Sequence, residues 1–463
     1  MTDWMRLLDE PAGKRVHCVG IGGFGMAGLA AFLQAQGFQV DGCDVAVNRL
    51  TRRLESLGIP VFIGHSADHL DPAPDLVVRS TAVSRDVPEI AAAIERGLPV
   101  CRRGELFPAL LRKVPRLVAV SGTHGKTTTT AMCAHAVRGA GALPSFFIGG
   151  EWEADGRVFE AGTFPAMVVE ADESDGTLIH YAPNIAVITG IDYDHMEHFA
   201  DQEAFIAVFR RFIQQTKEAL IYYGDDARLA GLVSDSPCRA VSYGFGENCT
   251  YRIADMEQGT FGARFCVQYE QERLGPFQLP VAGRHNVLNA VAAMLVAQEL
   301  GLSAEQAGAS FQNFRLVRRR FDFQGTHSGI KVYADYAHHP TEIQALLETV
   351  RQAHAARVIA IFQPHRYTRT RTLGRDFPPS FVGIDHVVLA PVYAASEQPL
   401  PSGTTADLAC HFAAFGEVEY SVADSLEAAW ERAVGEARAG DLLLLIGAGD
   451  IERLGALVDE PGA

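Results

Sequence analysis

Short apolar runs of strand length recur along the chain, separated by longer stretches with helical spacing. In the N-terminal part these runs fall at residues 16–19, 38–42, 61–63, 76–78 and 99–101. The helix expected after the first run covers residues 26–36. Apolar strands that alternate with helices predict a parallel sheet covered by helices.

The same alternation starts again twice. The second block has strand-like runs at residues 115–120, 166–169 and 185–188, an alternating pattern over 239–280 that predicts a small antiparallel sheet, and a helix at 286–300. The third has runs at residues 331–334, 358–362, 387–389 and 442–446, a helix at 342–354, and Asp424 as the expected cap of a helix ending near Gly440. We therefore expect three α/β domains, at residues 1–113, 114–318 and 319–463.

Composition narrows the class of protein. The 463 residues include 40 basic and 56 acidic ones, a net charge of −16 that argues against broad attraction to nucleic acid or to anionic membranes. No apolar run approaches the length of a membrane-spanning helix or a signal peptide core. The eight cysteines include no C-x-x-C pair, so neither a disulfide framework nor a zinc ribbon is indicated. We expect a cytoplasmic protein.

A glycine-rich segment at residues 121–128 follows a predicted strand and precedes a predicted helix. Such a turn places backbone N–H groups around phosphate oxygens at a helix N-terminus. Lys126 would reach the β- and γ-phosphates of ATP, and the Thr127 hydroxyl would bind Mg²⁺. The full Walker spacing is not met, because its first glycine would fall at Val120. The alternative is a glycine-rich surface turn with a solvated lysine.

Acidic residues and histidines follow the next two strands of this block. Because parallel strands end at one edge of a sheet, Glu170 and His195 are expected to meet Thr127 around a divalent ion. His195 and His198 also suggest zinc, but no cysteine or third histidine stands at zinc spacing. The acidic cluster taken alone also fits a solvated loop.

The N-terminal turn matches the dinucleotide fingerprint, with Gly20, Gly22 and Gly25 in G-x-G-x-x-G and Asp44 near the position of a ribose-binding acid. The motif predicts a pyrophosphate at that helix N-terminus without identifying the nucleotide. A separate ATP loop makes a nicotinamide cofactor less favoured than another nucleotide diphosphate.

Further polar pairs stand near predicted strand ends and helix starts. His285 and Asn289 lie one helical turn apart and can face one ligand, although an ordinary surface helix is as good an explanation. Arg366 and Arg369 follow a strand that we expect to neighbour the one before residues 335–342, and paired guanidiniums suit carboxylate recognition. Their alternative is a surface cation pair.

Taken in order, the motifs at residues 122–130, 170–175, 194–196, 283–286 and 335–342 resemble the Mur ligases, ATP-dependent amide-forming enzymes of peptidoglycan precursor synthesis. The resemblance spans essentially the whole chain. It implies a Rossmann-like N-terminal domain, a P-loop ATPase-like central domain with a small antiparallel sheet, and a Rossmann-like C-terminal domain. Within the family, residues 20–26, 319–321 and 362–369 resemble the members that attach L-alanine to UDP-N-acetylmuramate.

The resemblance implies a role for each site residue. The UDP-sugar would be held by Gly22, Gly23, Phe24, Gly25, Met26, Asp44, Ser80 and Thr81. The ATP phosphates would be held by Gly122, Thr123, His124, Gly125, Lys126, Thr127 and Thr128. Metal ions would be bound by Thr127, Glu170 and His195. Adenosine or phosphates would be contacted by His285, Asn289, Arg320 and Asp335. The amino acid and the muramyl carboxylate would face Tyr336, His338, Arg366 and Arg369.

The implied reaction joins L-alanine to the lactyl carboxylate through an acyl phosphate, with ATP and Mg²⁺ or Mn²⁺ as cofactors. Lys126, His338, Arg366 and Arg369 are the expected catalytic residues. UDP-N-acetylmuramate and L-alanine are the expected partners, without nucleic acid or membrane insertion, for a monomer or weak homodimer.

The chain departs from the family pattern at Gly190, where asparagine is usual, and at Asp86. A carbamylated lysine occurs in several Mur ligases, and Lys217 is a guess for its position. The remaining alternatives are a ligase that attaches a recycled tripeptide to the same UDP-sugar, an NAD-dependent dehydrogenase, and a non-enzymatic ATP-binding regulator.

Overall fold

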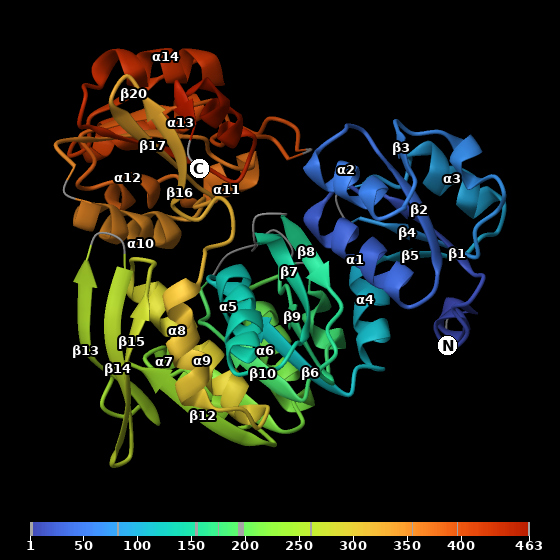
Figure 1. The fold of residues 1–463 in the computed structure, drawn as a ribbon. Coiled ribbons are helices and arrows are strands. Elements are labelled where there is room, and N and C mark those ends of the chain that lie inside the picture. The colour runs from blue at the N-terminus through green and yellow to red at the C-terminus, as the bar shows by residue number, and fades with distance from the viewer. Residues whose placement is uncertain are drawn as a thin grey trace. The chain divides into compact units, whose positions relative to one another are not determined.

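The computed structural model describes residues 3–80, 83–152, 156–174, 176–192, 199–259, 262–353, 355–395 and 397–461. Their strands form three sheets of five, ten and seven strands (Figure 1). By contacts, the chain divides into two compact units. One consists of residues 1–255, 265–278 and 288–317, and the other of residues 256–264, 279–287 and 318–463. The first two sheets belong chiefly to the first unit, and the three-domain division stays a prediction.

The first sheet is parallel, in the order β3-β2-β1-β4-β5. Its strands are β1 (Arg15–Val19), β2 (Gln39–Asp44), β3 (Val61–Ile63), β4 (Leu76–Arg79) and β5 (Val100–Arg102). The helices around it are η1 (Asp3–Leu8), α1 (Phe24–Ala35), α2 (Arg49–Ser56), η2 (Ala67–Leu70), α3 (Pro88–Glu95) and α4 (Arg103–Leu111). The strand order reverses beside β1, where Rossmann-like sheets bind nucleotides beyond the strand ends.

Alternate residues of β1 pack into different layers of this sheet. Val16 and Cys18 belong to a core that includes α1, whereas Val19 packs with Leu70 of η2 and Ile90 of α3. This alternation follows from the period of two along a strand. It means that both faces of the sheet are covered.

The second sheet has the order β15-β14-β13-β12-β11-β10-β6-β9-β7-β8. Its strands are β6 (Arg116–Ser121), β7 (Ser145–Trp152), β8 (Arg157–Glu160), β9 (Ala166–Glu170), β10 (Ile185–Ile188), β11 (Ala219–Tyr223), β12 (Arg239–Gly244), β13 (Tyr251–Gly259), β14 (Gly262–Tyr269) and β15 (Glu272–Leu279). The helices are α5 (Lys126–Gly139), η3 (Thr177–His180), α6 (Gln202–Gln215), α7 (Ala227–Val233), α8 (Arg284–Glu299), α9 (Ala304–Ser310) and η5 (Phe311–Asn313).

In this sheet β6 lies between β9 and β10, parallel to both, so the three strands end at one edge. The small antiparallel sheet predicted over 239–280 is corrected in part, because β12 (Arg239–Gly244) runs parallel to β13 (Tyr251–Gly259) and the strands of this region belong to one larger sheet. Strands β12–β15 continue the ten-stranded sheet, and β12 runs parallel to β11. An alternating pattern indicates that a strand has one buried face, but it does not specify the neighbour with which the strand pairs.

The third sheet has the order β20-β19-β18-β21-β17-β16-β22. Its strands are β16 (Asp322–His327), β17 (Ile330–Asp335), β18 (Val358–Phe362), β19 (His386–Leu389), β20 (Tyr420–Val422), β21 (Leu442–Ile446) and β22 (Glu460–Pro461). The helices are α10 (Pro340–Val350), η6 (Arg351–Ala353), α11 (Tyr367–Leu373), α12 (Phe377–Ser380), α13 (Thr405–Phe415), α14 (Leu426–Glu436) and η7 (Ile451–Leu457).

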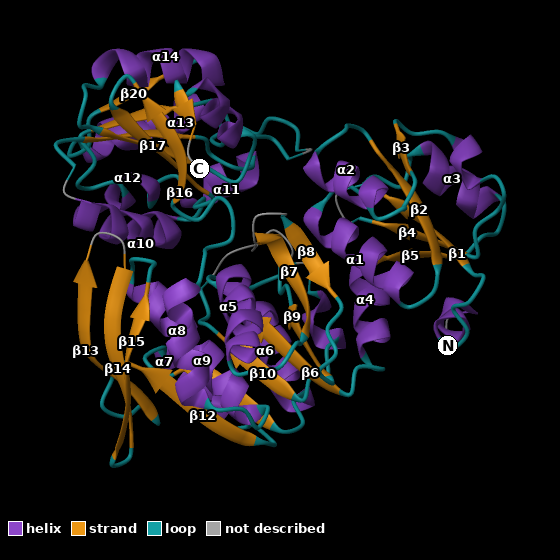
Figure 2. Ribbon diagram, in the orientation of Figure 1, coloured by secondary structure: helices purple, strands orange, loops and turns teal. Residues whose placement is uncertain are grey.

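Helices cover both faces of this sheet (Figure 2). On β21, Leu444 and Ile446 pack in the core that contains α10, α12 and α13, while Leu443 and Leu445 pack in the core that contains α14 and η7. Two expectations are corrected here. Strand β21 lies between β17 and β18, which are therefore not neighbours. The cap of α14 is Ser425 rather than Asp424, and its side chain accepts from the Ala428 N–H.

Within the described ranges, none of the helices has the length and apolar character needed to cross a lipid bilayer.

Candidate functional site

The glycine-rich turn between β6 and α5 has the geometry of a phosphate-binding loop. Gly122 and Gly125 have φ values of 128° and 80°, which favour glycine, and Gly125 is the N-cap of α5. A Cβ atom on Gly122 would lie 2.2 Å from the Thr189 hydroxyl oxygen. Glycine is therefore required for both the backbone conformation and the close approach of the segment after β10.

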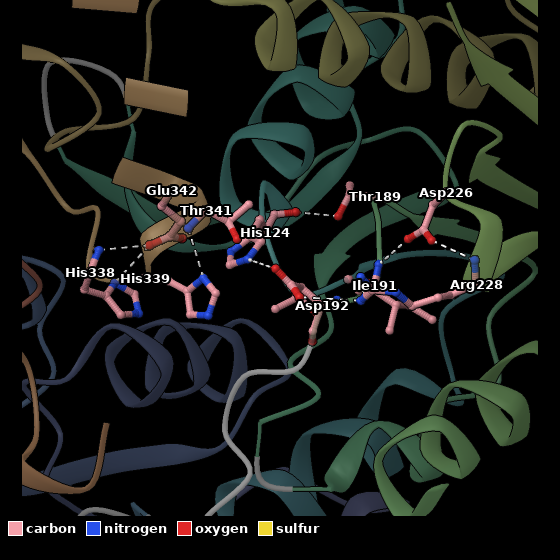
Figure 3. Close-up of polar contacts among 12 residues, drawn as sticks. His124, Thr189, Ile191, Asp192, Asp226, Arg228, His338, His339, Thr341 and Glu342 are labelled. Atoms are coloured by element: carbon pink, nitrogen blue, oxygen red, sulfur yellow. Dashed lines mark hydrogen bonds and ion pairs between the residues drawn. The ribbon is translucent and has the colours of Figure 1, made fainter. Parts of the chain in front are cut away.

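The segment after β10 holds the glycine-rich loop through several polar contacts, some of which are drawn in Figure 3. The Thr189 hydroxyl donates to the His124 carbonyl at 2.5 Å, and the Thr123 N–H donates to the Gly190 carbonyl at 3.0 Å. The His124 imidazole faces the Asp192 carboxylate at 3.6 Å. Two of the predicted residues, Thr123 and His124, are thus held by Thr189, Gly190 and Asp192 of the segment after β10.

Asp226 and Arg228 hold the same segment from its far side (Figure 3). The Asp226 carboxylate caps α7 and accepts the Ile191 N–H at 2.9 Å. The Arg228 guanidinium donates to the Ile191 carbonyl at 2.6 Å. Sequence reasoning did not single out this pair, because a short helix start gives no sign of what its cap also binds.

Lys126 is held inside the loop. Its Nζ donates to the Gly122 carbonyl at 2.7 Å and the Thr123 carbonyl at 3.1 Å, and it pairs with the Glu173 carboxylate at 2.9 Å. Burial alone would lower the pKa of the Lys126 ammonium, but Glu173, Asp172 and Glu170 outweigh burial and hold this pKa above its usual value. Lys126 is therefore charged, as a phosphate ligand requires.

Two of the predicted metal ligands lie together. Glu170 ends β9, its carboxylate accepts the Gly149 N–H at 2.9 Å, and the Thr127 hydroxyl also hydrogen-bonds to it. Burial raises the pKa of Glu170, while Lys126 and these hydrogen bonds act against the rise. A hydroxyl and a carboxylate beside an ammonium form an oxygen-donor set that fits Mg²⁺. The third predicted ligand, His195, lies outside the described residues, as does His198.

Asn289 of α8 approaches the same loop, because a Cβ atom on Gly125 would lie 3.1 Å from the Asn289 amide oxygen. Thr128 follows Lys126 in the first turn of α5 and is buried. His285 also lies on α8, where burial and the nearby Arg320 lower its pKa to about 4. His285 is thus a neutral imidazole near pH 7, able to donate or accept a hydrogen bond but not to supply positive charge.

At the N-terminal glycine turn, Asp44 is already engaged by the backbone. Its carboxylate accepts the Gly22 N–H at 2.8 Å. Asn48, which sequence reasoning missed, donates from its amide to the Gly22 carbonyl at 3.1 Å. A Cβ atom on Gly22 would lie within 2.9 Å of both side chains. The turn is therefore fixed by side chains from the end of β2 and the start of α2.

The start of α1 carries the other predicted UDP-sugar residues. Gly23 is the N-cap, Phe24 and Gly25 open the helix, and Met26 points into the core with an exposed fraction of 2%. Only the backbone of Met26 is available to a ligand.

Side chains from other elements lie beside this helix start. A Cβ atom on Gly25 would lie 3.0 Å from the guanidinium of Arg103, the first residue of α4. Ser80 lies beside Gly20 and donates its N–H to the Val19 carbonyl, while Thr81 is outside the described residues. Arg103 was missed because nothing in its local sequence points to the glycine turn.

In the C-terminal sheet, Asp335 ties two loops together. One carboxylate oxygen accepts the Phe321 N–H at 2.7 Å and the other accepts the Ala337 N–H at 2.8 Å. Burial raises the pKa of Asp335, and Arg320 opposes the rise. The Arg320 guanidinium lies 5.4 Å from the centre of the Tyr336 ring. Asp335 thus places Arg320 and Tyr336 against each other.

The predicted amino-acid residues lie around His365, which sequence reasoning did not select. The His338 ring lies 5.4 Å from Tyr336 and 5.8 Å from His365 between ring centroids. Arg369, 6% exposed, contacts the His365 Nδ1 at 3.2 Å. Strand β21 lies between β17 and β18, the strands that precede these residues, yet the His338 and His365 rings still approach each other beyond the strand ends.

Acidic side chains accompany this cluster. Glu342 of α10 lies 3.3 Å from the His338 Nδ1 (Figure 3), and the same nitrogen is 2.9 Å from the Tyr336 carbonyl. Arg366, at the N-cap of α11 with φ of 70°, pairs with Glu397 at 3.9 Å. The structure therefore brings Tyr336, His338 and Arg369 together and pairs Arg366 with an acid.

Three family models match the chain in succession. The Mur ligase family catalytic domain matches residues 15–114, the Mur ligase middle domain matches residues 120–297, and the Mur ligase glutamate ligase domain matches residues 319–449.

Relatives and solved structures agree with these matches. UDP-N-acetylmuramate–L-alanine ligases from Anaeromyxobacter sp. (strain Fw109-5) and Solibacter usitatus are each 39% identical, over 95% and 96% of this chain and 96% and 95% of their own. The crystal structure of UDP-N-acetylmuramate–alanine ligase from Thermotoga maritima superimposes with a TM-score of 0.81 at 30% identity, over 96% of this chain and 97% of that one. A murein peptide ligase from Psychrobacter arcticus gives a TM-score of 0.72 at 23% identity over the same shares. On these matches, which extend over nearly its whole length, the chain belongs to the Mur ligase family.

Proposed function

We propose that this protein is an ATP-dependent ligase that joins L-alanine to the lactyl carboxylate of UDP-N-acetylmuramate. The observation that carries the proposal is the 39% identity, over nearly the full length of both chains, to enzymes named for that reaction. The NAD-dependent dehydrogenase hypothesis fails, because the chain belongs to the Mur ligase family.

The site residues fit a reaction that begins with phosphoryl transfer. A carboxylate is a poor electrophile, because amine attack would have to expel an oxide. Transfer of the γ-phosphoryl group gives an acyl phosphate, whose leaving group is inorganic phosphate. This step depends on positioning and charge neutralisation. Lys126 supplies a fixed ammonium, and a Mg²⁺ ion held by Thr127 and Glu170 would supply further positive charge on the phosphate oxygens.

The amine then has to lose a proton as the amide forms. His338 is our candidate acceptor, because Glu342 and the Tyr336 carbonyl both lie at its Nδ1. When Nδ1 carries the proton, Nε2 has the lone pair that can take a proton from the alanine amine. Arg369 is our candidate for binding the alanine carboxylate, since guanidinium groups bind carboxylates through two parallel hydrogen bonds.

UDP would lie at the glycine turn before α1, with Arg103 as an additional pyrophosphate ligand.

The second candidate is a ligase that attaches a recycled tripeptide to the same UDP-sugar. The murein peptide ligase structure supports only the shared fold, at 23% identity. A tripeptide carries several carboxylates far from the new bond. The cations that the structure places around Tyr336 and His365 include Arg319, Arg320, Arg366 and Arg369, and Arg319 pairs with Glu452 while Arg366 pairs with Glu397. The alanine assignment is therefore favoured.

The test is release of inorganic phosphate by the purified protein with ATP, Mg²⁺, UDP-N-acetylmuramate and one amino acid at a time. We expect phosphate release that depends on both the UDP-sugar and L-alanine, with serine and glycine as slower substrates, because one methyl group contributes only about 1–3 kcal/mol of selectivity. Release that is independent of any amino acid would contradict the ligase proposal and favour the ATP-binding regulator.

A further inference from the structure

A second cluster of ligating side chains lies in the N-terminal sheet, next to the start of the glycine turn, where the Gly20 N–H donates to the Cys43 carbonyl at 2.8 Å. His17 comes from β1, Cys43 from β2 and Glu89 from the first turn of α3. All three have exposed fractions of 0%. One ligating atom of each lies within 4.8 Å of the other two. His65 and His69 border this group from the segment between β3 and the end of η2.

The orientation of His17 leaves one ring nitrogen without a partner. Its Nδ1 lies 2.6 Å from the Asp41 carboxylate, which also accepts from the Arg15 guanidinium at 2.6 Å. With the Nδ1 proton donated to Asp41, the lone pair is on Nε2. This Nε2 is buried and has no hydrogen-bond partner in the described part of the chain. Buried polar atoms rarely lack a partner, and a carboxylate on the far nitrogen is the usual arrangement behind a metal-binding histidine.

His65 lies beside two members of this group. Its Nδ1 lies 3.5 Å from the Cys43 sulfur and 3.1 Å from one Glu89 oxygen. The other Glu89 oxygen accepts the Ser66 N–H at 2.9 Å and lies 2.9 Å from the His69 Nδ1. Glu89 is therefore oriented by outer contacts, and its first oxygen remains beside His65 and Cys43.

The side chains around this cluster are apolar toward the protein core and partly exposed on the side of His65 and His69. The core that contains Cys43 also contains Val19, Leu70, Val77 and Ile90. His65 and His69 have side chains that are 19% and 16% exposed, so the cluster borders solvent on the side of these two imidazoles.

We propose that His17, Cys43, Glu89 and His65 bind a zinc ion. Two imidazole nitrogens, one thiolate and one carboxylate oxygen are ligands that Zn²⁺ accepts, whereas Mg²⁺ and Ca²⁺ select oxygen donors. Bonds of about 2.0–2.3 Å require the side chains to draw together from their present separations on binding the ion. The ion would join β1, β2 and α3 on the face of the sheet opposite Cys18 and α1.

The test uses the full chain, stripped with a chelator and then dialysed against Zn²⁺ with excess Mg²⁺, which occupies oxygen-donor sites. We expect one tightly bound zinc per chain, with a higher unfolding temperature than that of the stripped protein. Replacing zinc with Co²⁺ should give a sulfur-to-cobalt charge-transfer band, because a thiolate is among the ligands.

Cys43→Ser should abolish that band and weaken zinc binding at least about tenfold. Cys18→Ser is the matched control, because Cys18 is equally buried on the neighbouring strand but faces the other core, and it should retain both. His65→Gln, at a partly exposed position that is less sensitive to substitution, should weaken zinc binding even if Cys43→Ser fails to fold. Absence of bound zinc in the wild type, or a band that survives Cys43→Ser, would overturn the proposal and leave a hydrogen-bonded polar cluster.

Discussion

Lys126 contributes both to the predicted chemistry and to the stability of its loop, because its ammonium neutralises the fully buried Glu173. Lys126→Ala should reduce turnover about a hundredfold or more, since a transition-state phosphate contact is worth several kcal/mol. It should also lower the free energy of unfolding by about 3–5 kcal/mol, because it removes the ammonium that neutralises the buried Glu173 carboxylate. Phosphate release and denaturant unfolding measure the two effects.

The double variant Lys126→Ala with Glu173→Gln separates these effects. Removing both charges should restore most of the stability, whereas turnover should stay low. Lys331→Ala, at an exposed position of β17, is the control for loss of a lysine elsewhere. Normal turnover in a folded Lys126→Ala protein would rule out the phosphate role.

For Arg103 we predict a role in binding the UDP-sugar. Its guanidinium lies beside Gly25, where the resemblance places the UDP pyrophosphate. Arg103→Ala should raise the KM for the UDP-sugar about tenfold or more, since a hydrogen bond to a charged group is worth about 1.5–3 kcal/mol, and leave the KM for ATP nearly unchanged. The neighbouring Arg102 pairs with Glu105 at the surface, so Arg102→Ala should change neither value. An unchanged KM in Arg103→Ala would place the pyrophosphate elsewhere.

Only some of these residues could be predicted from the sequence. Lys126, Thr127 and Glu170 could be selected because each is tied to a local signal: a glycine turn, or an acid directly after an apolar strand. Arg103 and His365 have no such signal, since their roles depend on which helix or strand end folds against the site. Glu173 lay in the acidic cluster, but spacing alone does not say which acid pairs with the lysine.

At the scale of elements, the segment after β10 shows why a departure from the family pattern can be structural. Gly190 has φ of 151°, and its carbonyl accepts the Thr123 N–H of the phosphate loop. Gly190→Asn, the change toward the usual family residue, should therefore strain this backbone and cost about 1–3 kcal/mol of stability. Thermal unfolding of Gly190→Asn and Gly190→Ala checks this prediction.

The two substitutions share the backbone cost and differ only in the side-chain amide. The Cβ atom that both substitutions add meets no close contact, since the atom nearest to it is an Asp226 oxygen at 3.8 Å. If Gly190→Asn is as stable as the wild type while Gly190→Ala is not, the amide forms a compensating contact, and the strain argument alone is insufficient.

Element positions were far more predictable than element neighbours. The apolar runs at residues 185–188, 358–362 and 442–446 coincide with β10, β18 and β21 because buried parallel strands are continuous apolar segments. Their order in the sheet depends on pairing between distant segments, which no local pattern encodes. For this reason β21 between β17 and β18, and the continuous ten-stranded sheet, could not be foreseen.

At the scale of the whole molecule, the fold class followed from a strand, turn and helix pattern that occurs three times, and the full-length matches confirm it. The reaction itself is open to a direct chemical test. With ¹⁸O in the lactyl carboxylate of UDP-N-acetylmuramate, one label should appear in the released phosphate, because that oxygen bridges carbon and phosphorus in the acyl phosphate. Mass spectrometry of the phosphate reads the result, and unlabelled phosphate would indicate another activation.

The choice of amine substrate decides which Mur ligase reaction this chain performs. Offered L-alanine and the recycled tripeptide at equal concentration, the protein should form mainly the alanine product, read by mass. The cluster of Tyr336, His338 and Arg369 around His365 presents one buried guanidinium, which suits one carboxylate placed near the amine. Arg369→Ala should then raise the KM for L-alanine steeply, with smaller changes for ATP and the UDP-sugar, whereas Arg371→Ala on the exposed side of α11 should have little effect. A dominant tripeptide product would contradict the alanine assignment and leave the ligase fold and the acyl phosphate chemistry standing.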